Sequence, residues 1–185
     1  MTETMIQRRA MVDSQLKPQG VSDPAVLTAF ASVPREQFVP ERARAFAYFD
    51  RSIALRDGRW MMSPAALGQL IEALVVKAGE TALVVGSTGY AAAILANLGA
   101  SVSEVGLDIA EAPKGPFDVI LIEGAVEHVP QALDRALAPG GRLAAAVADR
   151  GVTRLSIGTG AGLRAFADAD VPLLAGFTHP QAFSF

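Results

Sequence analysis

The strongest candidate for ligand chemistry in this chain is a glycine-containing turn, Gly86–Gly89 (GSTG). It follows the apolar run TALVV and precedes YAAAILANLG, so the expected order is a buried strand, a turn and a helix. Backbone N–H groups and the helix dipole at such a junction can meet a phosphate or an adenosine ligand. The usual dinucleotide loop has three spaced glycines and this turn has two, which disfavours phosphate. A tight turn whose glycines only supply unusual φ and ψ angles explains the pattern at least as well.

Two carboxylates follow other apolar runs. Glu123 ends FDVILIE, and Asp108 follows a run from Val102 to Leu107 that we interpret as a further strand. Open parallel sheets bind ligands at the carboxyl ends of their strands, so either carboxylate could accept hydrogen bonds from ribose hydroxyls. Helix capping or a solvated charge is the commoner role of such a residue taken alone. Asp118 precedes its apolar run, which predicts a structural role at the opposite edge of the sheet.

The segment before the next expected helix offers weaker candidates. Ser63 is followed directly by Pro64 and has no histidine near it in sequence, so we interpret it as a helix cap rather than a nucleophile. Trp60, Met61 and Met62 form a bulky apolar cluster, which is more typical of a core or a lid than of a cofactor site. These residue types alone therefore identify no catalytic residue.

Composition excludes several classes of site. The chain has no cysteine, and its two histidines, His128 and His179, lack metal-ligand spacing, so we expect no metal, disulfide or iron–sulfur centre. The 16 basic and 19 acidic residues form no run of like charge, which argues against nucleic-acid and membrane-surface partners. Apolar runs stay shorter than the roughly 18 residues of a spanning helix, and MTETMIQRRA lacks the apolar stretch of a signal peptide. We therefore expect a soluble, cytoplasmic protein of one domain, residues 1–185.

The first third of the chain has helical signals. We expect helices over residues 6–16 and 24–33, the second capped by Ser22 or Asp23. A short helix is expected from Glu41. Its aromatic residues should cover part of the core: Phe46, Tyr48 and Phe49.

Strands alternate with helices after a helix that Ser63 caps and Gly79 ends. TALVV, FDVILIEG and RLAAAV are typical of strands, and PQALDRALAPGG of a helix that two glycines end. This order predicts an α/β fold, with a doubly wound, mostly parallel sheet and helices on both faces, formed by residues 61–185 beside a helical cap of residues 1–60. In the tail from Gly162 we expect two closing strands in an antiparallel hairpin.

Taken together, these segments resemble the protein-L-isoaspartate O-methyltransferase family, a branch of the S-adenosylmethionine-dependent Rossmann-like methyltransferases. The resemblance covers nearly the whole chain and is carried by RRAMVDSQLKPQGVSDPAVLTAFASVPREQFVPERARAFAYFD, by LVVGSTGY and by GPFDVILIEGAVEHVPQALDRALAPGGRL. It implies methyl transfer from S-adenosylmethionine to the free carboxylate of an isoaspartyl or D-aspartyl residue in a damaged protein. The methyl ester then closes to a succinimide, whose hydrolysis returns some normal aspartate. This is a protein repair cycle.

The resemblance also implies the site residues. A cofactor site would be formed by Gly86, Ser87, Gly89, Tyr90, Asp108 and Glu123. A substrate site would lie before the Pro64 helix, at Trp60, Met62 and Ser63. Family members carry hydroxyl residues at the positions of Trp60 and Met62, and Ser63 is offset from them by one.

The chain departs from the family most strongly around the cofactor. Val84 stands where family members have an acidic residue in the first strand, and the glycine turn is one residue shorter. Between Leu98 and Phe117 the family has a strand, a helix and another strand, for which SVSEVGLDIAEAPKG is too short. One βα unit, roughly half of a βαβ unit of about 30 residues, is therefore missing.

Either alignment of the surviving strand removes the carboxylate that holds the ribose. If it is the family's second strand, Gly106 replaces that acid. If it is the third, which the spacing to Phe117 favours, Asp108 matches an acid beside the adenine and the ribose strand is gone. The lost charge-assisted hydrogen bonds are worth about 1.5 to 3 kcal/mol.

Three functions remain open from the sequence. The first is an active isoaspartyl methyltransferase with weakened cofactor contacts. The second is a non-catalytic relative that keeps the fold and binds a peptide, a nucleotide-like ligand or another protein. The third is a Rossmann-type oxidoreductase, which the N-terminal signature disfavours. A sheet that has lost a strand leaves an edge that a second copy could fill, so a homodimer is a further hypothesis.

Overall fold

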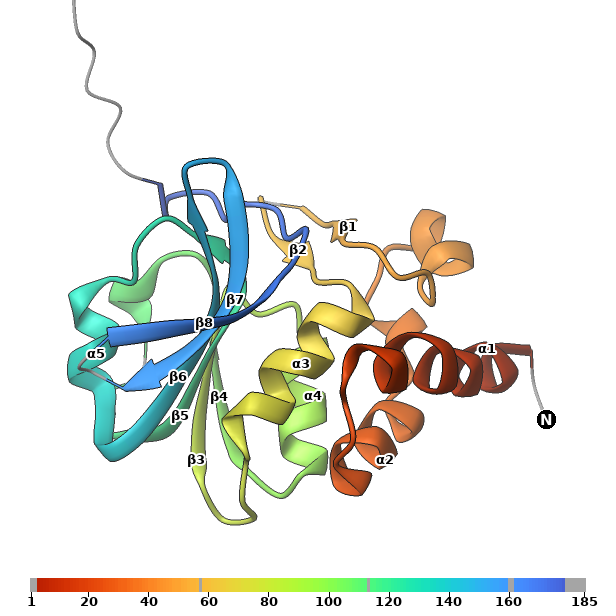
Figure 1. Cartoon of the computed structure of the whole chain (residues 1–185), viewed down its shortest axis with the longest axis horizontal. Helices are drawn as coiled ribbons and strands as arrows, with labels where there is room; N and C mark the ends of the chain where they lie inside the picture. The colour runs from red at the N-terminus through yellow and green to blue at the C-terminus, as the bar shows by residue number, and fades with distance from the viewer. Residues whose placement is uncertain (1–2, 57, 113, 160–161, 179–185) are drawn as a thin grey trace, which may run out of the picture.

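Six strands in the described part of the chain form one sheet, in the order β4-β3-β5-β6-β7-β8 (Figure 1). The computed structural model describes residues 3–56, 58–112, 114–159 and 162–178. Strands β4, β3, β5 and β6 pair in parallel, whereas β7 and β8 are antiparallel to their neighbours. The strands are β3 (Thr81–Val85), β4 (Ser101–Val105), β5 (Phe117–Val126), β6 (Leu137–Asp149), β7 (Val152–Thr159) and β8 (Gly162–Asp168), with a separate two-stranded ribbon of β1 (Ile53–Ala54) and β2 (Trp60–Met61). The predicted mostly parallel sheet and its closing hairpin are confirmed.

Both faces of the sheet are buried. In β3, Ala82 and Val84 pack on the face that α3 and α4 cover, whereas Leu83 and Val85 pack on the face of α5. A strand buried on both faces is apolar throughout, which explains the run TALVV. The covering helices are α3 (Pro64–Leu74), α4 (Tyr90–Asn97) and α5 (Gln131–Ala136), and none of the helices in the described ranges is long and apolar enough to cross a bilayer. The predicted helices on both faces are confirmed.

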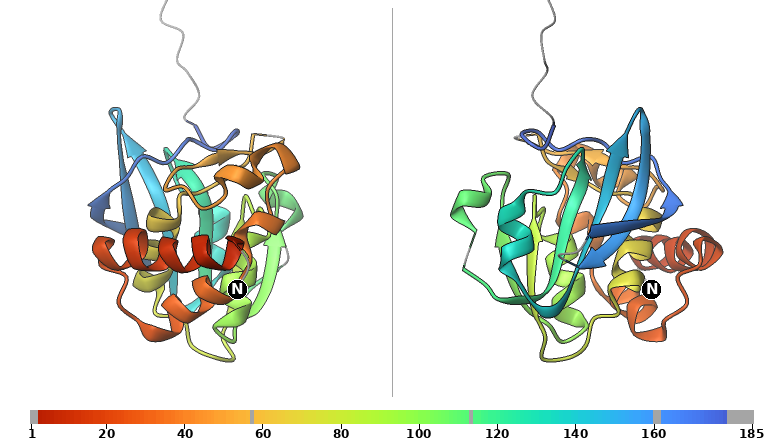
Figure 2. Two further views of the ribbon diagram at one scale, coloured as in Figure 1. Left: turned by 90° about the vertical axis from the view of Figure 1, so that its right-hand side faces the viewer. Right: turned by 60° about the vertical axis from the view of Figure 1, so that its left-hand side comes forward.

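The N-terminal helices lie on the side of α3 and α4 that faces away from the sheet (Figures 1 and 2). They are α1 (Glu3–Met11), which continues as a π-helical turn over Val12–Leu16, and α2 (Pro24–Ser32). The α2 cap is Asp23, whose Oδ1 accepts a hydrogen bond from the Ala25 N–H at 2.7 Å. Ser22 instead donates from its N–H and hydroxyl to Glu72 of α3, both at 2.9 Å. Ser22, the residue before the cap, therefore ties the N-terminal layer to α3.

The aromatic residues after Glu41 contribute less to the core than expected. Phe46 and Phe49 are 42% and 54% exposed, and only Tyr48 is buried. The guanidinium of Arg51 lies 4.9 Å and 5.7 Å from the centres of the two exposed rings. This cation–π contact is a reason for both rings to stay at the surface.

Two helices end earlier than expected. Helix α3 ends at Leu74 rather than Gly79, because Val75 adopts a left-handed conformation with φ of 48°. Helix α5 ends at Ala136, and the two glycines that were expected to end it lie within β6. A Cβ atom on Gly141 would lie 2.9 Å from the Phe117 carbonyl oxygen. Glycine is therefore needed there for β6 to approach β5.

The closing hairpin lies earlier in the chain than expected. Its first strand begins at Val152, before the tail in which both strands were expected. After β8 the chain crosses the upper end of the sheet in Figure 1, where Leu173 forms a bridge with Ala125 of β5. The end of the expected hairpin, residues 179–185, lies outside the described residues.

Asp118 lies at the amino end of β5, as expected for a structural residue. Its Oδ2 accepts hydrogen bonds from the N–H and the hydroxyl of Thr81, at 2.8 Å and 2.9 Å. These bonds join the first residues of β3 and β5, and they lower the pKa of Asp118. The predicted structural role is confirmed.

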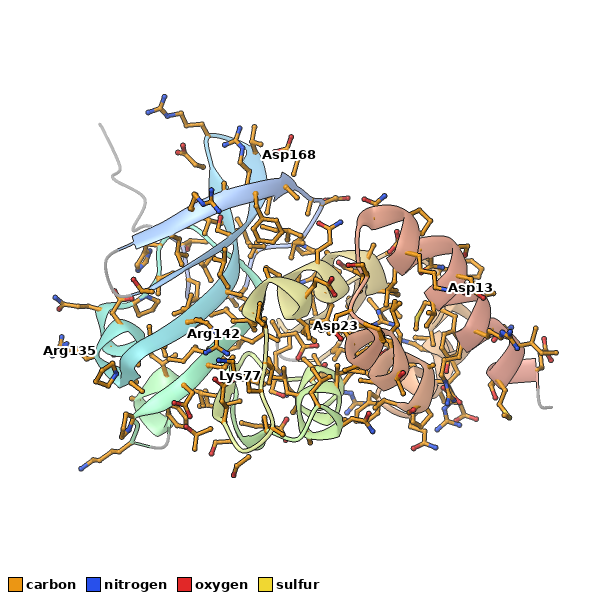
Figure 3. All side chains as sticks on the ribbon, turned by 60° about the horizontal axis from the view of Figure 1, so that its bottom comes forward. Asp13, Asp23, Lys77, Arg135, Arg142 and Asp168 are labelled. Carbon is orange, nitrogen blue, oxygen red and sulfur yellow. The ribbon has the colours of Figure 1, made fainter. Side chains whose placement is uncertain are left out.

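Arg142 of β6 fastens the end of α3 to the sheet (labelled in Figure 3). Its Nε donates to the Leu74 carbonyl oxygen at 2.6 Å, and its two terminal nitrogens donate to the two carboxylate oxygens of Glu80 at 3.0 Å and 2.7 Å. These bonds favour the ionised carboxylate and lower the pKa of Glu80. Arg142 thereby sets the position of α3, the helix that begins at Ser63.

Replacing Arg142 by alanine should lower the free energy of unfolding by about 1.5 to 3 kcal/mol at neutral pH, the usual worth of hydrogen bonds to charged groups. Because the pKa of Glu80 is lowered by folding, the stabilisation is present above the unfolded carboxyl pKa of about 4.3 and is lost as pH falls through the folded value. Urea unfolding at neutral and acidic pH measures both effects. The control Arg135→Ala, at an exposed position of α5, should change stability by less than about 0.5 kcal/mol. An equal loss for Arg142→Ala at both pH values would contradict this account.

Candidate functional site

The glycine turn lies between β3 and α4, at the carboxyl end of β3. Gly86 and Gly89 adopt positive φ angles of 70° and 87°, which favour glycine. Gly89 is also the residue that caps α4, and Tyr90 begins that helix as a fully buried side chain. The local order of strand, turn and helix is the one expected from the sequence.

All four N–H groups of the turn donate hydrogen bonds within the protein. The N–H groups of Gly86 and Ser87 donate to carbonyl oxygens at the end of β4, those of Gly106 (3.1 Å) and Val105 (3.2 Å). The Thr88 N–H donates to a carboxylate oxygen of Glu123 at 2.9 Å, and the Gly89 N–H donates to the Ser87 hydroxyl oxygen at 3.1 Å. The turn is thereby joined to the strands on both sides of β3.

Two further side chains hold the turn from outside. The hydroxyl of Ser87 donates to the carboxylate of Glu104 in β4. Arg59, in the loop between β1 and β2, donates from Nη1 to the Ser87 carbonyl oxygen at 2.7 Å. The turn is therefore connected to the cap region as well as to the sheet.

Glu123 is fully buried and is bonded to the turn. Its carboxylate accepts from the Thr88 N–H at 2.9 Å and from the Thr88 hydroxyl at 2.6 Å. Burial raises the pKa of Glu123 to about 7, and the bonds from Thr88 and the charge of Arg35 oppose that rise. The structure thus brings Glu123 to the turn, where it is a hydrogen-bond acceptor for the protein itself.

Asp108 occupies a different environment. Its carboxylate accepts from the Ala110 N–H at 3.0 Å and caps the short 3-10 turn Ile109–Glu111 that follows β4. The side chain is exposed. Of the six residues expected around a cofactor, the hydrogen bonds connect Ser87, Gly89 and Glu123 through the turn, whereas Asp108 is bonded only to its own turn among the contacts described.

A buried arginine behind the turn was missed by sequence reasoning. Arg35 is fully buried; it donates from Nε to the Ala47 carbonyl oxygen and from Nη2 to the Met62 carbonyl oxygen, both at 2.6 Å. Its guanidinium lies 5.0 Å from the centre of the Tyr90 ring. Only the position of this arginine inside FASVPREQFVP, a largely apolar segment, could have suggested that it is buried. The same pattern is also typical of a surface turn.

A cavity of about 400 Å³ lies beside the segment that precedes α3. Trp60 and Ser63 line it, whereas Met62 is fully buried in the core. The Ser63 hydroxyl oxygen accepts from the Ala66 N–H at 3.4 Å, as a cap of α3. The cavity is also lined by Asp50, Arg51, Ser52, Asp168 and Asp170.

The polar groups of the cavity are unequally engaged. Asp50 accepts from the Ala65 N–H at 3.1 Å, and Asp168, labelled in Figure 3, pairs with Arg154 at 3.2 Å. The hydroxyl of Ser52 is buried and has no hydrogen-bond partner among the described residues. The cavity is therefore lined by three carboxylates, Asp50, Asp168 and Asp170, and by Ser52, whose hydroxyl is buried and unpaired among the described residues.

No group of three or more acidic or histidine side chains in the described ranges is arranged to hold an ion. His128 lies in the loop before α5, and His179 lies outside the described residues.

The family model of protein-L-isoaspartate(D-aspartate) O-methyltransferase matches the chain over residues 7–112 and again over 108–157. A protein-L-isoaspartate O-methyltransferase 1 of Rhodopseudomonas palustris is 35% identical over 183 positions, which cover 83% of this chain and 75% of that protein. A protein-L-isoaspartate O-methyltransferase of Methylorubrum populi is also 35% identical, over 202 positions that cover 91% of this chain and 95% of the relative. Since 91% of 185 residues is about 168, about 34 of the 202 positions face a gap in this chain. The family match restarts at residue 108, between β4 and β5, where a unit was expected to be missing.

Two solved structures share the fold. One is a proposed protein-L-isoaspartate O-methyltransferase of Plasmodium falciparum in complex with S-adenosyl-L-homocysteine, with a TM-score of 0.76, 18% identity, and coverage of 90% of this chain and 97% of that chain. The other is a protein-L-isoaspartate O-methyltransferase with a TM-score of 0.73, 21% identity, and coverage of 91% and 66%. These likenesses support the α/β architecture.

Replacing Glu123 by glutamine should change how stability depends on pH. Because burial raises the pKa of Glu123 to about 7, the folded chain keeps a proton that the unfolded chain releases above its pKa of about 4.3. Wild-type stability should therefore fall as pH rises from about 4.3 to about 7, and this fall should be smaller in Glu123→Gln. Thermal unfolding across this range measures it, with Glu3→Gln on exposed α1 as the control. Identical pH profiles for wild type and Glu123→Gln would sink the assignment.

Proposed function

The chain belongs to the protein-L-isoaspartate O-methyltransferase family, and from that premise we propose that it recognises isoaspartyl residues in peptides or proteins. The observation that carries this proposal is the cavity of about 400 Å³ that Trp60 and Ser63 line. Both residues come from the segment in which the family resemblance places the substrate. A cavity of this size is within the range of small-ligand sites, about 300 to 1,000 Å³.

The polar lining of the cavity supplies donors for a ligand carboxylate. The hydroxyl of Ser52 has no partner among the described residues, and a ligand acceptor would satisfy it once the side chain turns toward the cavity. Ser63 uses its hydroxyl oxygen as an acceptor for the Ala66 N–H and keeps its proton for donation. These two hydroxyls take the place of the family's hydroxyl residues, whose positions hold Trp60 and Met62 here.

The rim of the cavity favours a particular flanking sequence. Asp50 and Asp168 have partners within the protein, whereas no partner is described for Asp170. The lining also holds one cation, Arg51, whose guanidinium lies over two aromatic rings. A peptide with a basic residue beside its isoaspartyl residue would complement this rim, and an acidic flank would be repelled. We therefore propose basic isoaspartyl peptides as the preferred substrate class.

S-adenosylmethionine is the methyl donor of this family, and the Plasmodium falciparum protein was solved with S-adenosyl-L-homocysteine. The residues of this chain do not fit such a group in the arrangement described. All four N–H groups of Gly86–Gly89 are bonded within the protein. Glu123 is fully buried and bonded to Thr88, and Asp108 is an exposed residue that caps its own turn.

Binding without methyl transfer is therefore the function that the geometry supports best. Methyl transfer is the second candidate, favoured by 35% identity with two relatives that bear the methyltransferase name. It would require the internal hydrogen bonds of Thr88 and Gly89 to be exchanged for bonds to a ligand.

Calorimetric titration with a basic isoaspartyl peptide should give a micromolar dissociation constant, and the same peptide with ordinary aspartate should bind at least about tenfold more weakly. Trp60→Ala should weaken binding because it removes a wall of the cavity. The matched control is Val152→Ala, a half-exposed residue of β7 that does not line the cavity. Equal affinity for both peptides would refute substrate recognition.

A methylation assay separates the two candidate functions. With S-adenosylmethionine and the same isoaspartyl peptide, we expect no methyl ester and no release of S-adenosylhomocysteine. Turnover in this assay would establish the methyltransferase and reject binding without transfer.

We also propose a homodimer through the free edge of β4. Within the described sheet, β4 pairs only with β3, and its outer edge is the kind of surface that recruits another strand. Light scattering at micromolar concentration should find a dimer, and a monomer alone would reject this part of the proposal.

A further inference from the structure

The sheet has one place where a ligand of a doubly wound fold is expected. Such ligands bind outside the carboxyl ends of the strands, where neighbouring strands send their connections to opposite faces. Here that place lies between β3 and β5, because α4 follows β3 on one face and α5 follows β5 on the other. Gly86 directly follows β3, and Gly124 follows Glu123 in β5.

A leucine of this chain lies against both glycines. A Cβ atom on Gly86 would lie 3.1 Å from Cδ1 of Leu174, and one on Gly124 would lie 2.4 Å from its Cγ. Gly86 and Gly124 have φ angles of 70° and 151°, so both backbones also take conformations that favour glycine. Leu174 is fully buried as a result. The glycines therefore make room for a side chain of the protein at the place where they could make room for a ligand.

The segment around Leu174 is bonded to the end of β5 as an added strand would be. The Ala125 N–H donates to the Pro172 carbonyl oxygen at 3.0 Å, and the Leu174 N–H donates to the Ala125 carbonyl oxygen at 2.8 Å. Just past the end of β5, the Glu127 N–H donates to the Phe177 carbonyl oxygen at 2.9 Å. The segment 171–177 is held by backbone bonds on both sides of its buried leucine.

Two side chains of this segment, Leu174 and Phe177, belong to the core on the α5 face, whereas Val171 packs in the core on the other face. Leu174 and Phe177 are buried together with Val85, Val105 and Ile122, residues near the carboxyl ends of β3, β4 and β5. In Figure 1 the chain after β8 passes over this end of the sheet. Through these two side chains the segment is part of the folded core.

From these contacts we infer that the segment 171–177 is the resident occupant of the ligand crevice, with Leu174 filling the space between Gly86 and Gly124. A nucleoside-sized ligand is shut out for as long as the segment is seated. The inference concerns the crevice at the glycine turn, whereas the proposed function rests on the cavity at Trp60 and Ser63. The segment and the cavity share one residue, Pro172, but they are tested with different probes, a peptide for the cavity and a nucleoside for the crevice.

Amide hydrogen exchange on the full wild-type chain tests whether the segment is seated. The amides of Ala125, Leu174 and Glu127 should exchange as slowly as the amides of β3, because each donates to a bond that only opening of the segment or of the sheet can break. Exchange of the Leu174 amide at the rate of an unprotected chain would overturn the inference without any variant.

Leu174→Ala and Leu173→Ala form a matched pair for the same experiment. Leu173 is 40% exposed, whereas Leu174 is fully buried. The Leu174→Ala variant should speed exchange of the Glu127 amide at least about tenfold, and Leu173→Ala should leave it unchanged. Equal effects of both variants would contradict a specific role for Leu174.

The probe for the crevice is S-adenosyl-L-homocysteine. Calorimetry on the wild type should give no binding at about 1 mM ligand, and the exchange rate of the Leu174 amide should not change. Micromolar binding would overturn the inference, whether the segment stays protected or is released. Peptide binding is measured separately, so a failure here leaves the proposed peptide site standing.

Discussion

The carboxylate of Glu123 has no access to water, and the carboxyl edge of the sheet is arranged around it. Burying such a group is costly unless donors surround it. Thr88 supplies two donors from one residue, which fixes the turn against β5 and leaves the turn's remaining N–H groups to β4 and to Ser87. Arg35 adds a buried positive charge that favours the ionised form of the Glu123 carboxylate. The turn is therefore a structural joint between β4, β3 and β5.

Sequence reasoning predicted the elements that a periodic pattern or a cap specifies. Asp23 and Ser63 cap α2 and α3, and the uniform run TALVV is the strand buried on both faces. It failed where a side-chain contact that no periodic pattern specifies decides the outcome. The Arg51 guanidinium lies over Phe46 and Phe49, and no local pattern announces that contact.

The candidate site shows the same division. The position of Glu123 at the end of a strand could be predicted, but its bonds to Thr88 could not, because the partner is chosen by the fold. A single leucine in an aperiodic tail carries no signal that it will be buried, so Leu174 could not be found. Arg35 is hidden for the opposite reason, because a charged residue after a proline is ordinarily exposed.

Leu174 also makes three separate positions behave as one in the sequence. A side chain at position 124 would collide with Leu174 as well as strain the backbone, and one at position 86 would press on the same leucine. Substitutions at these positions are therefore tolerable only in combination. Among relatives that keep this arrangement, glycine at positions 86 and 124 should be inherited together with leucine at position 174, and a relative with a small residue at 174 escapes the collision but keeps the backbone strain. Glycine at 86 and 124 with leucine at 174 is thus the residue combination that we expect in relatives whose crevice is filled by this segment.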